Sequence, residues 1–226
     1  MIYFDNVSKI YPPLSVALEN VTFALEPGEF VSVVGQSGAG KTSLIKILLA
    51  EECPTEGKVF FESVDIHGLS AKELPHLRRR IGTVFQDIRL LPTKTVSENI
   101  TFALEASGKP DEEIEADVPA VLELVGLSNR SLHFPHELSG GEQQRAAIAR
   151  AIVNRPDVII ADEPTGNLDP LNTMEIIKLL GKINEMGTTV FMATHNKDII
   201  NSIGKRVITM EKGRITRDEK RGRYVL

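Results

Sequence analysis

The sequence predicts an α/β fold in which helices cover both faces of a largely parallel sheet. Strand-like apolar runs alternate with helical segments through most of the 226 residues. Two of these runs, FVSVV at 30–34 and VIIA at 158–161, are continuously apolar, as expected of strands buried on both faces. The stretch from about 87 to 156 is helical in pattern, which indicates a helical lobe inserted into a sheet-based core.

The individual elements follow from local pattern. Alternating segments at 2–11 and 17–26 predict two strands, and a turn at Pro27–Gly28 precedes the strand at 30–34. Further strands are expected at KVFF, IGTVF, DVIIAD and TTVFMAT, and in a last hairpin through Lys212–Gly213. Helices are expected in TSLIKILLA, near 70–79, in three segments of the lobe, and at about 171–186. We therefore expect one domain, with core sheet subdomains at 1–86 and 157–226 and a helical subdomain at 87–156.

Composition excludes several classes of protein. A chain that is 42% hydrophobic and 25% charged, with a formal charge of −5, is typical of a globular protein with a substantial core. The single cysteine, Cys53, allows no intrachain disulfide and favours a reducing compartment. The sequence shows no signal-peptide pattern, and its apolar runs are far shorter than the ~20 residues that cross a bilayer.

Charge is uneven along the chain. Residues 205–226 carry eight Lys or Arg against three acids, a balance of +5. Such a segment could touch acidic lipid headgroups or nucleic acid, and an ordinary solvated end of the chain is the alternative. We expect no nucleic-acid partner.

A glycine-rich loop predicts a phosphate site. GQSGAGKT at 35–42 fits the P-loop pattern, with a buried-type strand before it and a helix after it. Its glycines allow backbone N–H groups to approach phosphates, Lys41 supplies a positive charge, and the Thr42 hydroxyl can bind magnesium.

Polar residues end three other apolar strands. Asp162 and Glu163 follow VIIA, Gln86 follows IGTVF, and His195 follows TTVFMAT. Parallel sheets present their ligands at the carboxyl ends of the strands, so these side chains should meet beside the phosphates. There Asp162 can hold magnesium, and Glu163 can face the attacking water as a general base or polarising group.

A second helix start has the features of an anion site. LSGGEQQR at 138–145 places Ser139, Gly140 and Gly141 at the head of a helical stretch, where N–H groups are free and the helix dipole is positive. One chain would then carry two phosphate-binding helix starts.

Taken in order, these motifs resemble the nucleotide-binding subunits of ATP-binding cassette (ABC) systems. The resemblance covers the P-loop, a Q-loop at Gln86, the signature LSGGEQQR, the Walker B run VIIADE, a D-loop GNLD at 166–169 and a switch at His195. It implies a P-loop NTPase domain with a RecA-like mixed sheet, an antiparallel β-subdomain and the inserted helical lobe. It also implies that the signature closes over ATP held by a second subunit, so that a homodimer encloses two ATP molecules.

The resemblance assigns roles to particular residues. Catalysis is expected of Glu163, His195 and Gln86, and metal binding of Thr42, Gln86 and Asp162. Tyr11 is expected to stack on adenine, although a core or edge tyrosine is the alternative. Nucleotide contacts are further expected from Gly35, Gln36, Ser37, Gly38, Ala39, Gly40, Lys41, Thr42, Ser43, Ser139, Gly140, Gly141 and Asp169.

Within the family, FQDIRLLPTKTVSENI at 85–100 and RDEKRGRY at 217–224 most resemble the cell-division branch. That branch implies an FtsX-like integral membrane partner, contacts with cell-division proteins, and a cytoplasmic location on the inner face of the plasma membrane. A lipoprotein-release or macrolide-export ATPase is the alternative. We expect the partner to dock near Gln86, where Ile88, Leu90 and Leu91 alternate with charged residues in a way that suits an amphipathic helix; a packed connector is the alternative.

Overall fold

The computed structural model describes residues 1–222 and contains two sheets with different strand directions. The antiparallel sheet has the order β2-β1-β4-β5, and the larger sheet has the order β10-β9-β3-β8-β7-β6. All neighbours in the larger sheet are parallel except the β10/β9 pair. The strands are β1 (Ile2–Tyr11), β2 (Ser15–Leu25), β3 (Phe30–Val34), β4 (Glu56–Phe61), β5 (Val64–Asp65), β6 (Ile81–Phe85), β7 (Val158–Asp162), β8 (Thr189–Thr194), β9 (Arg206–Glu211) and β10 (Arg214–Glu219).

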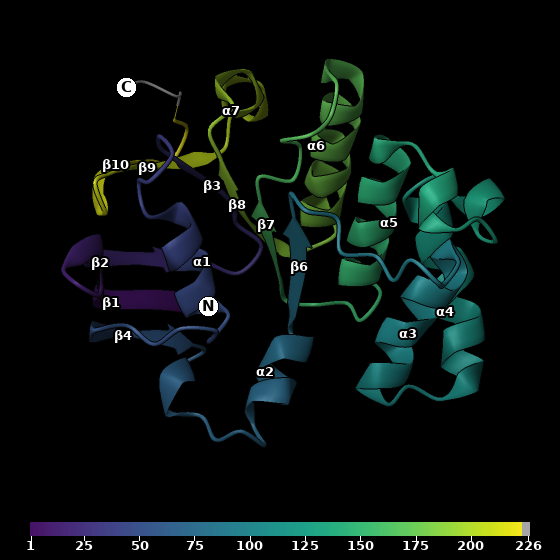
Figure 1. Ribbon diagram of the computed structural model, residues 1–226, viewed down its shortest axis with the longest axis horizontal. Coiled ribbons are helices and arrows are strands. Elements are labelled where there is room, and N and C mark those ends of the chain that lie inside the picture. The colour runs from purple at the N-terminus through teal and green to yellow at the C-terminus, as the bar shows by residue number, and fades with distance from the viewer. Residues whose placement is uncertain (223–226) are drawn as a thin grey trace.

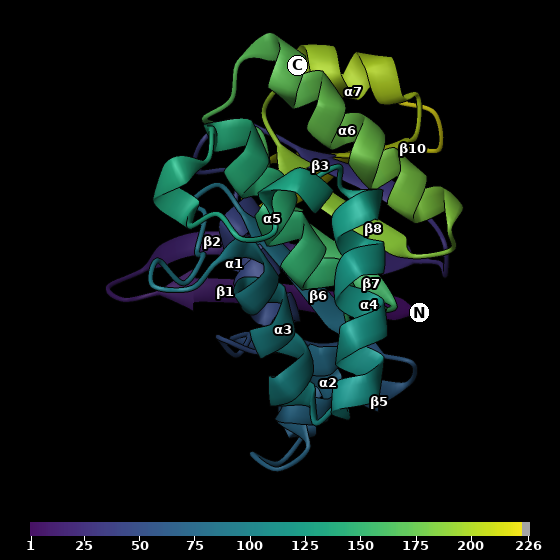
Figure 2. The same ribbon diagram turned by 90° about the vertical axis from the view of Figure 1, so that its right-hand side faces the viewer.

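Helices α3 to α6 lie on one face of the larger sheet, and α1 and the antiparallel sheet lie on the other. The helical lobe is far from the antiparallel sheet (Figure 1). In the lobe α3, α4 and α5 pack against one another, and α6 packs on α5 (Figure 2). The helices are α1 (Lys41–Leu48), α2 (Leu74–Arg79), α3 (Val96–Ser107), α4 (Asp111–Leu124), α5 (Gly140–Ile152), α6 (Pro170–Glu185) and α7 (Lys197–Ile203), with 3-10 turns at Ile66–Gly68, Ser128–Arg130 and Pro135–Glu137. None of the helices within 1–222 has the length and apolar character needed to cross a membrane.

The larger sheet separates two apolar cores. Along β3, Phe30 and Val34 face the core shared with α3 to α6, whereas Val31 and Val33 face the core shared with α1 and the antiparallel sheet. The rings of Phe4 and Phe23 stack 4.6 Å apart, and Phe23 lies 6.2 Å from Phe191 of β8, which joins the two sheets. Side chains that alternate between two buried faces explain why the strands read as continuous apolar runs.

The expected strands and helices are present, and the short strand β5, helix α7 and the 3-10 turns are additional. Thr95 and Glu98 form a capping box at the start of α3, and Gly108, at φ 81°, ends that helix. Helix α7, directly after His195, was not predicted, because KDIINSI is short and weakly patterned.

One glycine in β6 is fixed by close packing on α5. A Cβ built at Gly82 would lie 2.5 Å from the carbonyl oxygen of Ala151 and 3.2 Å from Pro156. We predict that Gly82→Ala lowers the free energy of unfolding by about 1–3 kcal/mol, because the backbone of α5 has to shift. Gly181→Ala is the matched control: nothing lies within 4 Å of its Cβ in the interior of α6, so it should stabilise by up to about 1 kcal/mol. Denaturant unfolding of both variants measures this, and equal effects would contradict the packing argument.

Candidate nucleotide site

Four parallel strands end in one row. The register pairs Val34 with Thr194, Ala193 with Asp162, and Asp162 with Phe85. The residues that follow these strand ends therefore meet at one edge of the sheet, as the sequence predicted for Gln86, Asp162, Glu163 and His195. All four line a single cavity of about 730 Å³, together with residues 36–43 of the glycine loop.

The glycine loop approaches its neighbours too closely for other residue types. Gly40 has φ 102°, and a Cβ on it would lie 2.4 Å from the carbonyl oxygen of Ala17. A Cβ on Gly35 would lie equally close to the carbonyl oxygen of Met210. Gly40 is also the N-cap of α1 and supplies no side-chain cap, so the first N–H groups of the helix stay available to an anion in the cavity.

Lys41 is held beneath the loop. Its Nζ donates to the carbonyl oxygens of Gly35 at 2.8 Å and Gln36 at 3.3 Å, and lies 3.9 Å from Oε1 of Glu163. This buried ammonium group has only backbone carbonyls as hydrogen-bond partners, and phosphate oxygens can replace them.

Asp162 and Thr42, the two residues predicted to hold a metal, are hydrogen-bonded to each other. Burial raises the pKa of the Asp162 carboxyl, and Glu163 raises it further, while Lys41 and a hydrogen bond from Thr42 oppose the change. A cation beside Asp162 would offset both of the causes that disfavour its charged form.

The donor set fits magnesium. Residues 1–222 contain no cluster of three or more His, Cys, Asp or Glu side chains that could hold a metal unaided. Magnesium needs no such cluster, since it keeps several waters and binds through one or two carboxylates together with substrate phosphates. Asp162 and the Thr42 hydroxyl would hold it, with Gln86 in the same cavity. When bound, the ion neutralises charge on the β- and γ-phosphates.

Glu163 connects the strand ends of β7 and β8. Its backbone has φ 48°, an uncommon value for a residue with a side chain, and its N–H donates to the carbonyl of Ala193. Its carboxylate lies 2.7 Å from Nδ1 of His195 and accepts a longer bond, 3.3 Å, from the His195 backbone. The left-handed turn thus aims Glu163 into the cavity between Lys41 and His195, where strain of this kind is often found.

Tyr11 lines the cavity at the end of β1. Its hydroxyl contacts Glu52 and Ser43, Nζ of Lys9 lies 5.1 Å from its ring centroid, and burial, followed by Glu52, raises its pKa. Its adenine-stacking role stays a prediction. The sequence analysis missed Ser15, Val16 and Ala17, which line the same cavity from the start of β2; only pairing of β1 with β2 brings them there.

The signature residues lie elsewhere. Ser139, Gly140 and Gly141 begin α5 as predicted but do not line the P-loop cavity of this chain. The Ser139 hydroxyl donates to Glu142 at 2.8 Å, and Arg130 donates to the other oxygen of that carboxylate at 2.8 Å. These bonds, Arg130 first, lower the pKa of Glu142 to about 2.

Asp169 also lies outside the cavity. Its carboxylate caps α6 by accepting from the N–H groups of Leu171 and Asn172, whose side chain fills the space beside Gly141. The predicted nucleotide contact of Asp169 is therefore not made within the described chain. Gln86 does contact the same D-loop, through Asn167 at 3.3 Å.

Comparison with known proteins agrees with this geometry. Residues 18–166 match the ABC transporter family. The chain is 53% identical over 224 residues to the cell division ATP-binding protein FtsE of Bacillus subtilis (strain 168), across 99% of this chain and 98% of the relative. Identity to FtsE of Escherichia coli (strain K12) is 45% over 215 residues, across 95% and 97%. The dimeric post-hydrolysis structure of the ATP-binding cassette MJ0796, bound to ADP and Pi, superposes with a TM-score of 0.87 at 36% identity, over 99% of this chain and 100% of that one.

The fold and the site define an ATP-binding cassette ATPase, an enzyme that binds ATP with Mg²⁺. The similar sequences identify the family more narrowly than the fold does. The chain belongs to the FtsE family of cell division ATP-binding proteins.

The position of Glu163 generates a direct test. Glu163→Gln keeps the side-chain shape and leaves Lys41 and Asp162 in place to hold phosphate and metal, so ATP should still bind. It removes the negative charge expected beside the attacking water, so hydrolysis should fall by roughly 100-fold or more. Turnover by phosphate release and nucleotide affinity by titration measure the two effects, and light scattering should show an ATP-dependent dimer. Glu185→Gln, at an exposed site near the end of α6, is the control. Near-normal turnover in Glu163→Gln would reject the role.

Proposed function

We propose that the chain hydrolyses ATP in a head-to-tail homodimer that drives an FtsX-like membrane protein in bacterial cell division. The observation that carries the dimer is the separation of two phosphate-binding helix starts: α1 opens into the P-loop cavity, whereas the start of α5 does not. A second subunit that supplies its α5 would complete the cavity, and the names of the FtsE relatives supply the cell-division assignment.

In this proposal each residue acts at a stated place. Lys41 and the N–H groups of the loop hold the phosphates, and Thr42 and Asp162 hold the metal. Glu163 accepts the proton of the attacking water, and His195, bound to its carboxylate, holds that carboxylate in position. The lobe at 87–156 moves as a unit against the sheet, with Gln86 at the boundary.

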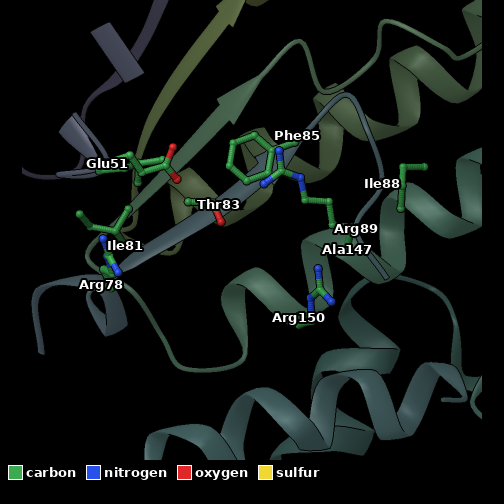
Figure 3. Close-up of a pocket in the computed structure, with 10 residues that line it drawn as sticks. Glu51, Arg78, Ile81, Thr83, Phe85, Ile88, Arg89, Ala147 and Arg150 are labelled. Atoms are coloured by element: carbon green, nitrogen blue, oxygen red, sulfur yellow. The ribbon is translucent and has the colours of Figure 1, made fainter. Parts of the chain in front are cut away.

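A groove beside the lobe is the proposed docking site of the membrane partner. It has a volume of about 540 Å³ and lies between α2, β6, the segment after Gln86, and α5. Figure 3 shows Phe85 and Arg89 over its middle and Ile88 at the side of the lobe. The groove spans both the sheet and the lobe, so its shape would change when the nucleotide moves one against the other. With a membrane partner docked there, the chain would lie in the cytoplasm, at the inner face of the plasma membrane.

Fewer residues after Gln86 line the groove than the sequence indicated. Ile88 and Arg89 line the groove, but Leu90 packs against the core of the lobe, and Leu91 is tied by its backbone to Asn99. Leu90 therefore fits the alternative of a packed connector, Leu91 does not line the groove, and Ile88 is the residue to test.

Arg223, part of the basic segment, lies outside the described residues. Within those residues, Arg206 pairs with Glu29 and Asp218, and Arg214 pairs with Glu19. Two of the segment's eight basic residues are thus paired within the chain.

The dimer proposal predicts two opposite patterns of damage. Ser139→Arg should leave ATP binding by the isolated subunit nearly unchanged but block closure and hydrolysis, because the signature serves the other subunit's nucleotide. Lys41→Ala should instead weaken ATP binding first. Nucleotide titration of monomers and ATP turnover separate the two; loss of monomer affinity in Ser139→Arg would contradict the proposal.

The partner proposal predicts that Ile88→Ser lowers copurification with the FtsX-like protein from cells while ATP binding survives, because a groove contact is lost. Phe102→Ser is the control, since Phe102 is a partly exposed apolar residue of α3 that does not line the groove. Unchanged capture would reject the docking surface. Capture of a lipoprotein-release or export permease in place of an FtsX-like protein by the unaltered chain would reject the cell-division assignment.

A further inference from the structure

The docking groove is positively charged. Its lining residues include three arginines, Arg78, Arg89 and Arg150, and a single acid, Glu51. The remaining wall is largely apolar and includes Ile81, Phe85 and Ile88. An occupant with apolar side chains and a carboxylate would match this surface in shape and in charge.

The three arginines differ in how their guanidinium groups are satisfied. Arg78 reaches the carbonyl oxygen of Ala50 at 3.5 Å, and Arg89 stacks over the ring of Phe85 with Cζ 4.5 Å from the centroid. Arg150 has neither kind of contact: within the described residues it makes no hydrogen bond, ion pair or ring contact. Glu51, in the same groove, does not pair with it.

Arg150 is nevertheless the most buried of the three. Arg150 lies on α5, one turn after Ala147, and both residues line the groove. The small side chain of Ala147 leaves space there, and the guanidinium of Arg150 points from the helix toward the groove (Figure 3). Burial lowers its pKa, with no acidic group to oppose the change. A partly buried cation with five donors and no acceptor is costly, and a carboxylate satisfies it best because two parallel hydrogen bonds form.

We propose that Arg150 is the anchor for one acidic side chain on an amphipathic cytoplasmic helix of the membrane partner. The apolar residues of that helix lie against Ile81, Phe85 and Ile88, and its carboxylate reaches the floor of the groove. Arg78 and Arg89 flank the entrance and attract the same negative charge. This inference rests on the proposed function and adds to it the chemistry that selects the partner.

The free subunit provides the first measurement. Replacing a partly buried, unpaired charge with an apolar side chain of similar length removes a desolvation cost, so Arg150→Met should melt no lower than the unaltered protein. It should also bind ATP normally, since Arg150 does not line the nucleotide cavity. If Arg150→Met melts lower and its folded fraction still captures the partner, Arg150 is a structural residue and the proposal is wrong.

Copurification with the FtsX-like partner provides the second measurement. Arg150→Met should capture at least roughly tenfold less partner, because the partner's carboxylate would be left buried and unpaired. Arg150→Lys should retain part of the binding, as a charge without the planar pair of donors. Arg79→Met is the matched control: Arg79 is exposed on α2 and does not line the groove, so capture should be unchanged.

A charge exchange identifies the partner residue. Arg150→Glu should abolish capture, and reversal of one acidic residue in the partner's cytoplasmic segments to Arg should restore it. Undiminished capture by Arg150→Met, or an equal loss with Arg79→Met, would overturn the anchor.

Vesicles of phosphatidylglycerol and phosphatidylethanolamine should bind the unaltered protein and Arg150→Met equally; Arg150-dependent binding would assign the groove to lipid phosphate instead. If the unaltered chain folds and binds ATP but captures no FtsX-like protein, the proposed function itself fails.

Discussion

Register between four parallel strands is the constraint on which this protein depends. Backbone hydrogen bonds of β3, β8, β7 and β6 align their carboxyl ends, so the residues one step beyond each strand share a single edge. A shift of one residue in any of these strands would turn its buried side chains to the opposite core and move its polar residue out of the row. The two apolar cores therefore fix the register, and the register assembles the nucleotide cavity.

The same edge couples the cavity to the rest of the molecule. The carboxylate of Glu163 contacts Lys41 and His195, and so links the P-loop to the end of β8. Gln86 follows β6 and leads into the segment that lines the proposed docking groove. The carbonyl oxygen of Phe85, just before it, accepts a hydrogen bond from Gln144 of the signature helix at 3.4 Å. Nucleotide, signature helix and groove thus converge on the end of β6. A change in nucleotide at the cavity has a short physical route to the groove, through one strand end and one helix.

Local pattern predicted most of the fold, because buried parallel strands and amphipathic helices leave strong periodic signals. It also predicted that Gln86, Asp162, Glu163 and His195 would meet, since their positions after apolar strands need only a parallel sheet. What it missed depends on contacts between distant segments. Residues of β2 reach the cavity through pairing with β1, and Arg130 reaches Glu142 through the fold of the lobe. Leu90 and Ile88 are both apolar residues of one loop, and sequence could not tell that one packs inward while the other lines the groove.

The central claim is that each nucleotide site takes its P-loop from one chain and its signature from another. Mixing Lys41→Ala subunits with Ser139→Arg subunits tests it most directly. In a mixed dimer, the Ser139→Arg chain still has an intact P-loop and faces the intact signature of the Lys41→Ala chain, so one complete site forms. The account predicts that the mixture hydrolyses ATP although neither variant does so alone. Activity of the mixture no greater than the sum of the separate variants would contradict it.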